Sequence, residues 1–167
     1  MKLDEAREHW RAELARLEAV GAWLDAGKPQ VHATLGAWLG TYQRLKTPLA
    51  KVALKEAREA NAADAFIRLF SAFEYEFRAA FSEWLAKKSA CGAAPPVLDE
   101  ALPESLRSVL NLAAVLEPRF DRSRSGCVGR VIDCRNRLVH GGFASQMPFD
   151  LDDLHTLLSG VVATFKT

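Results

Sequence analysis

Apolar residues recur every three or four positions along most of this chain, and this spacing restricts its fold more than any other feature. Such spacing gives each segment one apolar stripe and one charged face, as in an amphipathic helix. Composition points the same way, because 27 alanines and 22 leucines outnumber the 19 valines, isoleucines and threonines taken together. We therefore predict an all-α fold built around one core.

Proline and glycine divide the chain into successive predicted helices. Segments 3–24 and 29–46 form an N-terminal helical hairpin, which we assign to an accessory unit of residues 1–47 packed on the same core. Residues 48–167 form the main helical domain. Its most apolar helix is expected at 64–88, joined by a bend near Asn61 to an alanine-rich helix before it. The other expected elements are a loop at 89–102, a helix at 103–116, an arginine-rich connection at 119–126, a helix at 127–140 and a closing helix from Asp150.

Charge and cysteine content exclude several classes of protein. The formal net charge is only +1, which argues against a protein that coats nucleic acid with its whole surface. No apolar run approaches about 18 residues, so we expect no membrane-spanning helix. Three cysteines at irregular spacing fit neither a disulfide framework nor a zinc site, which favours a reduced, cytoplasmic location. No metal or cofactor is expected, because metal-like spacing is absent from His9, His32 and His155.

Two charged residues fall on faces that should be buried. On a helical wheel of 127–140, Arg135 lies near the centre of an apolar arc, which consists of Val128, Val131, Ile132, Leu138 and Val139. Glu74 lies within the apolar face of 64–88, and Glu76 lies nearer its border. Because an arginine cannot lose its proton, a buried one needs a carboxylate partner or a route to water. We predict that Glu74 and Arg135 face each other, either at a catalytic site or as a structural salt bridge that fixes helix register.

The segment 134–141, Cys-Arg-Asn-Arg-Leu-Val-His-Gly, carries the most chemical information. Asn136 and His140 are four residues apart and share one edge of the helix, while Arg135 is near enough for long side chains to converge at the helix end. An arginine can neutralise a phosphodiester as charge develops, and a histidine can transfer a proton near neutral pH. The plainer interpretation is a last-turn histidine favoured by the helix dipole and followed by a glycine cap.

The spacing Arg135-Asn136-x3-His140-Gly141 resembles the Arg-x4-6-His signature of the HEPN superfamily, in its Arg-Asn-x3-His form. The resemblance runs from about residue 60 to the end and does not cover 1–47. It comprises a long early helix with an inward acidic residue, matched by Glu74, then the motif helix and a closing amphipathic helix. It implies an up-and-down helical bundle. The branch paired with small nucleotidyltransferases has tyrosine two residues after the histidine, whereas this chain has Gly142, so its His-Gly pattern is closer to other branches.

The resemblance implies a metal-independent endoribonuclease that needs no cofactor. Two protomers of a homodimer would join their arginines and histidines in one cleft, and the RNA 2′-hydroxyl would attack to leave a 2′,3′-cyclic phosphate and a 5′-hydroxyl. His140 would transfer protons and Arg135 would hold the scissile phosphate. Asn136 would orient either group or a substrate oxygen, and Glu74 would position Arg135. Such proteins commonly act as toxins or in antiviral defence, with an antitoxin or a nucleotidyltransferase as partner.

Arginines are concentrated around the motif. Residues 119–140 hold six arginines against two aspartates, which leaves the rest of the chain with a negative balance. Arginines here are therefore candidates for binding the RNA backbone, or else they form a solvated strip with Asp121 and Asp133 as ion partners. The candidate RNA-binding residues are Arg122, Arg124, Arg130 and Arg137.

Two other functions stay open. One is a non-catalytic dimerisation or adaptor module for a nucleotidyltransferase or other enzyme, and the other is a nucleotide-sensing bundle that holds a phosphate.

Overall fold

The computed structural model describes residues 1–28, 36–91, 102–120, 122–140 and 148–166. Within them the chain forms six α-helices and no strand, which confirms the predicted all-α fold. None of the described helices combines the length and the apolar content needed to cross a membrane. The helices are α1 (Leu3–Asp25), α2 (Gly36–Arg44), α3 (Thr47–Ala90), α4 (Leu106–Leu116), α5 (Arg122–Val139) and α6 (Leu151–Phe165).

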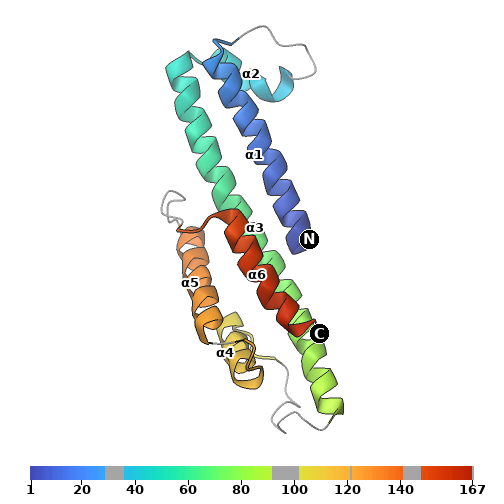
Figure 1. Cartoon of the computed structure of the whole chain (residues 1–167). Coiled ribbons are helices and arrows are strands. Elements are labelled where there is room, and N and C mark those ends of the chain that lie inside the picture. The colour runs from blue at the N-terminus through green and yellow to red at the C-terminus, as the bar shows by residue number, and fades with distance from the viewer. Residues whose placement is uncertain (29–35, 92–101, 121, 141–147, 167) are drawn as a thin grey trace.

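A single long helix, α3, forms the spine of the molecule (Figure 1). Its 44 residues run without interruption, so the bend expected near Asn61 is wrong. Alanines on both sides of Asn61 favour helix, and a neighbouring helix packs along each half of α3, which keeps the backbone straight there. α1 lies antiparallel along the first half of α3, α6 lies along the second half, and the α4–α5 pair packs beside that second half.

Several element boundaries differ from those expected. α3 continues to Ala90 and α4 begins at Leu106, and most of the loop expected at 89–102 lies outside the described residues. The helix expected at 29–46 is described only from Gly36 and ends at Arg44, and the preceding residues 29–35 lie outside the described part. α5 begins at Arg122, so most of the expected arginine-rich connection is helical. Gly126 does not interrupt this helix, because its backbone is not in the left-handed region. The closing helix is confirmed, since Asp150 caps α6 by accepting hydrogen bonds from the amides of Asp152 and Asp153.

The helices enclose one main core and one smaller apolar cluster. The main core centres on aromatic rings of α3 and α6, where the Phe165 ring centre lies 5.2 Å from that of Phe81 and 5.6 Å from that of Phe77. α1 adds Trp10 to this core, so the N-terminal residues pack on it. We call the smaller group the upper cluster; it is formed by α1, α2 and α3 and consists of Val20, Leu24, Leu39, Ala50 and Leu54.

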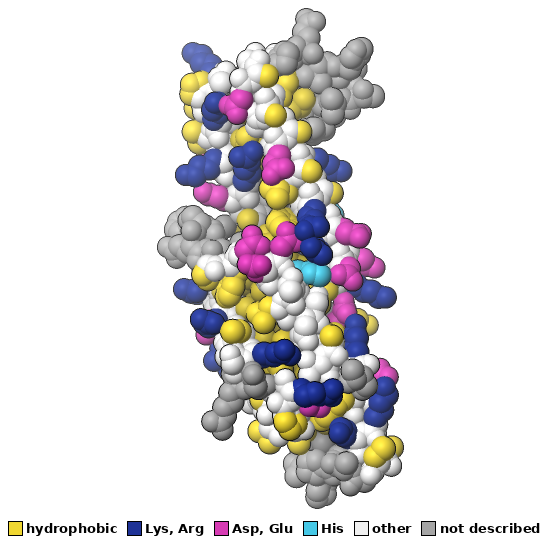
Figure 2. Space-filling model, in the orientation of Figure 1, with side chains coloured by type: hydrophobic (Ala, Val, Ile, Leu, Met, Phe, Trp, Pro, Cys, Tyr) yellow, Lys and Arg dark blue, Asp and Glu magenta, His cyan; other side chains and the backbone are white. Residues whose placement is uncertain are grey.

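Charged side chains fix the start of α1 to α3 and α6. The Leu3 amide donates to Oε1 of Glu76 at 2.7 Å, and Lys166 binds the other carboxylate oxygen at 3.1 Å. Asp152, in the first turn of α6, pairs with Arg7 at 2.9 Å and with Arg11 at 2.8 Å. Figure 2 shows acidic and basic side chains gathered where α6 begins. These contacts satisfy an end amide of α1 and hold that helix on the main core.

Candidate functional site

α5 carries the motif residues and packs one side against the main core. Val128 and Val131 are fully buried and Ile132 is nearly so, which confirms the predicted apolar arc at these positions. Val139 is 50% exposed, so its expected burial is wrong. It is the last residue of α5, and helical periodicity alone does not tell whether a neighbouring element reaches that far.

The Arg135 side chain reaches from α5 to α3. Its guanidinium carbon lies 5.8 Å from the centre of the Phe70 ring, and Phe70 is itself buried. Nη1 donates to Oδ1 of Asn136 at 3.1 Å, whereas the buried Nε has no hydrogen-bond partner among the described residues. A cation over an aromatic face gains roughly 0.5–2 kcal/mol, but the ring does not neutralise the charge. Arg135 is thus held in place without a carboxylate from the described part of the chain.

Glu74 does not hold Arg135, so the predicted pairing is wrong. Its carboxylate accepts hydrogen bonds from Arg78 on the same helix, at 3.2 Å from Nε and 3.1 Å from Nη2. Arg78 also donates to the backbone oxygens of Pro103 and Glu104, just ahead of α4. The four-residue spacing offers Arg78 to Glu74 however the helices pack, so the local pair forms in place of the distant one. Glu74 therefore helps to tie the start of α4 to α3.

Asn136 and His140 lie on the exposed side of α5. The His140 amide donates to the backbone oxygen of Asn136 at 3.1 Å, which continues the helical hydrogen bonding past the end of α5. At 100° per residue, the side chains of Arg135 and His140 leave the helix about 140° apart. One chain therefore presents its arginine toward α3 and its histidine toward solvent. Gly141 and Gly142, the expected cap, lie outside the described residues.

Part of the predicted arginine strip has structural partners. Arg119 binds the buried carboxylate of Glu117 at 2.9 Å, and the hydrogen bonds from Arg119 hold the pKa of that carboxyl below its usual value despite burial. Arg124 lies 3.5 Å from the Thr164 hydroxyl on α6. Arg122 opens α5, and its side chain lies outside the described part of the structure. These contacts attach the residues just before α5 to the end of α4, and the start of α5 to α6. Arg130 and Arg137, further along α5, remain as candidates for binding a ligand.

Arg130 and Arg137 are exposed and lie one heptad apart on α5. Arg130 donates to Sγ of Cys127 at 3.2 Å, and Arg137 interacts with the Cys134 thiol. Sulfur is a weak acceptor, and neither arginine pairs with a carboxylate among the residues that the structure describes. Burial raises the pKa of the Cys134 thiol more than Arg137 lowers it, so this thiol is not an activated nucleophile.

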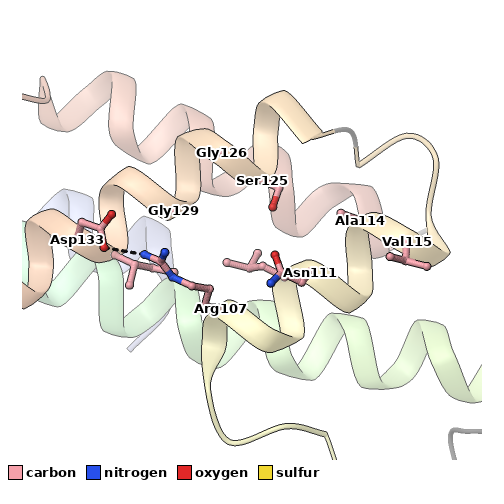
Figure 3. A pocket seen from close by; sticks show the side chains of 10 residues that line it. Arg107, Asn111, Ala114, Val115, Ser125, Gly126, Gly129 and Asp133 are labelled. Carbon is pink, nitrogen blue, oxygen red and sulfur yellow. Dashed lines mark hydrogen bonds and ion pairs between the residues drawn. The ribbon is translucent and has the colours of Figure 1, made fainter.

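Two grooves border α5, each with a volume of about 680 Å³. The α4/α5 groove lies between those two helices, and Figure 3 shows Ser125 and Asn111 facing each other across it. At its end Arg107 reaches across to Asp133 at 2.6 Å. The α5/α6 groove lies on the other side of Asp133, between α5 and the residues that lead into α6. Its lining consists of Arg130, Asp133, Arg137, Pro148 and Phe149.

Sequence reasoning missed Phe70 as the partner of Arg135. Phe70 and Glu74 are four residues apart on α3, so the helical wheel placed both near the arginine and charge complementarity favoured the carboxylate. The sequence could have indicated Phe70, because arginine also binds the faces of aromatic rings. His155 was missed as well: it is buried on α6, with Nε2 3.0 Å from Oδ1 of Asp4, so it belongs to the attachment of α1.

The described residues contain no group of three histidine, cysteine or acidic side chains placed to hold a metal ion. Comparison of the chain with protein-family models, with curated proteins and with solved structures finds no match. The function of the site is therefore inferred from its own residues.

Proposed function

We propose that this protein is a HEPN-type endoribonuclease that cuts RNA without a metal, as a cytoplasmic homodimer serving a toxin or antiviral defence system. The observation that carries the proposal is the way in which the Arg135 side chain is held. It is a permanent cation held over Phe70 and hydrogen-bonded to Asn136, at the same helix end as the exposed His140. A guanidinium that no carboxylate of the described residues engages keeps its N–H groups available to a phosphate.

The proposed reaction is a transfer within the RNA itself. The 2′-oxygen attacks the adjacent phosphorus, the bond from phosphorus to the 5′-oxygen of the next nucleotide breaks, and the products carry a 2′,3′-cyclic phosphate and a 5′-hydroxyl. His140 accepts the proton of the 2′-hydroxyl as the new bond forms and then gives a proton to the departing 5′-oxygen, so the protons balance over the step. Arg135 stabilises the negative charge that builds on the non-bridging oxygens. Asn136 holds the Arg135 guanidinium through its hydrogen bond of 3.1 Å.

A second copy of the chain supplies what one helix does not bring together. Arg135 and His140 leave α5 about 140° apart, so each site takes the arginine of one copy and the histidine of the other. Arg135→Ala and His140→Ala should each be inactive alone. After subunit exchange the mixture should recover about a quarter of wild-type activity, because half of the dimers are mixed and each of these has one intact site. No recovery from demonstrably mixed dimers would contradict a shared site.

Cleavage of labelled RNA in excess EDTA tests the chemistry. We expect the wild-type protein to cut under these conditions, and His140→Ala to lose about 100-fold or more of the rate. His9→Ala changes another exposed histidine, on α1, and should retain full activity. Loss of cleavage in EDTA, or full activity of His140→Ala, would overturn the proposal. A folded protein that cuts no RNA and retains a bound enzyme would instead identify an adaptor module.

A further inference from the structure

The α5/α6 groove has a net positive charge. Arg130 and Arg137 line it without a carboxylate partner from the described residues. The acidic residue in the lining, Asp133, is engaged by Arg107 of α4 at 2.6 Å, as Figure 3 shows. The two unneutralised guanidiniums are two helical turns apart, about 10 Å along the axis of α5. The groove is therefore suited to a ligand with more than one anionic group.

The opposite wall of the groove is apolar and includes an aromatic ring. This wall consists of Pro148 and Phe149. Both residues come directly before Asp150, the N-cap of α6, so the start of that helix holds them in position. The Phe149 ring stacks against Phe66 of α3, with ring centres 6.2 Å apart and planes inclined by 24°. Phe149 is only partly buried, so part of the ring remains available to a ligand. A planar apolar surface that shares a groove with two cations matches a nucleotide, which joins a flat base to phosphates.

The groove also lies on the same side of α5 as His140. Asp133, Arg137 and His140 are spaced by four and three residues, so they form one stripe along the helix. A strand bound in the groove would therefore continue directly past the histidine. The volume of about 680 Å³ lies within the range of about 300–1,000 Å³ found for small-ligand sites.

We propose that the α5/α6 groove binds one nucleotide unit of single-stranded RNA next to the scissile phosphate, with the base against Phe149 and the flanking phosphates on Arg130 and Arg137. The choice of RNA as the ligand rests on the proposed function. A base inside a duplex has no free face for an aromatic side chain, so this groove selects unpaired RNA.

Equilibrium binding to RNA that cannot be cleaved separates this inference from catalysis. The probe is a fluorescent single-stranded oligonucleotide with 2′-O-methyl groups, which lacks the attacking hydroxyl. We expect Phe149→Leu to weaken its binding about tenfold and Phe149→Tyr, which keeps the ring, to bind like the wild type. We expect Arg130→Gln to reduce the slope of log affinity against log salt by about one. Arg16→Gln, on α1 away from the groove, is the matched control.

Three results would overturn the inference. They are equal binding by Phe149→Leu and the wild type, equal affinity for the single strand and its duplex, and no binding of the single strand at all. Thermal unfolding shows whether Phe149→Leu is folded; if it is not, Arg130→Gln and the comparison of single strand with duplex decide. A different result would contradict the proposed nuclease alone. In that case the protein binds the probe through Phe149 but cuts no unmodified RNA, so the groove is a binding site without catalysis.

Discussion

At the scale of single residues, the candidate site depends on how one arginine is held. Arg135 lies over the face of the Phe70 ring and is hydrogen-bonded to Asn136. It forms no ion pair with Glu74, which binds Arg78 instead. An aromatic support restrains a guanidinium while leaving its charge intact, whereas a carboxylate would compete with a phosphate for the same N–H groups. Phe70 is thus a positioning residue in the proposed reaction.

Replacing Phe70 by leucine tests this role. We expect Phe70→Leu to lower kcat about fivefold with little change in KM, because roughly 1 kcal/mol of cation–π support for Arg135 is lost where charge develops. Phe73→Leu removes another buried ring of α3, which stacks on Phe77. Both variants should unfold at lower temperature. If both lower kcat equally per folded molecule, the loss comes from general disturbance of the core and not from the contact between Phe70 and Arg135.

The same residues show how far sequence reasoning goes. The helical wheel correctly placed Arg135 on the inward side of its helix, because the backbone fixes where each side chain begins. It did not identify the partner, since several α3 residues share the facing stripe and Glu74 has Arg78 within its own helix. Choosing between a ring and a carboxylate requires the positions of two helices relative to each other, which periodicity does not contain.

A second residue-scale prediction concerns acid. Burial raises the pKa of Glu76, but the Leu3 amide and the Lys166 ammonium together bring it below its usual value of 4.5. The folded protein therefore binds this proton less readily than the unfolded chain, so the stabilisation is complete above the usual pKa and is lost as pH falls through the folded-state value. Denaturant midpoints between about pH 7 and pH 3 should decline less steeply for Glu76→Gln than for wild type.

The control for that experiment is Glu83→Gln, which changes a carboxylate that is 71% exposed on the same helix. Its acid dependence should follow the wild-type curve. Identical curves for Glu76→Gln and the wild type would show that the contact between Leu3 and Glu76 contributes nothing to the pH dependence of folding.

At the scale of elements, α5 retains two glycines that its own packing does not require. A Cβ added to Gly126 or Gly129 would meet no atom within 4 Å, and neither backbone is left-handed. Glycine inside a helix costs about 1 kcal/mol relative to alanine. Both glycines border the α4/α5 groove, so the lack of a side chain keeps this part of the groove open to something that approaches from outside.

We expect Gly126→Ala and Gly129→Ala each to raise the free energy of unfolding by up to about 1 kcal/mol in the monomer. If a second copy packs on this face, the same variants should weaken dimerisation, measured by sedimentation. Gly21→Ala is the control, because its Cβ would lie 2.8 Å from Nη2 of Arg58 and force that side chain to move. An equal gain at all three positions would show that packing around the glycine is irrelevant.

The elements also show which boundaries a sequence reveals. The start of α6 was predictable because Asp150 caps it through two local hydrogen bonds. The continuity of α3 was not, because whether a helix bends at Asn61 depends on the helices packed beside it. Arg122 to Gly126 were expected to be a connection, yet they are helical, since arginine and serine tolerate a helix once α5 packs on the core.

At the scale of the whole molecule, one helix joins two apolar clusters of unequal size. Among the described residues, the upper cluster holds five that are buried, whereas the main core contains the packed rings around Phe165. Local stability follows the amount of buried apolar contact, so the end of the molecule with the upper cluster should open more readily. Hydrogen exchange is expected to be faster around Leu24 and Leu54 than around Phe77. Uniform protection along α3 would contradict two units of different stability.

The unbroken course of α3 gives the protein a fixed internal length. Each residue advances the helix by about 1.5 Å, so Leu54 and Phe70 are separated by about 24 Å along a single rod. A molecule recognised at the upper cluster would therefore be held at a set distance from Arg135. If the proposed nuclease holds RNA at that end, the length of α3 sets how far along the strand from that contact Arg135 meets it.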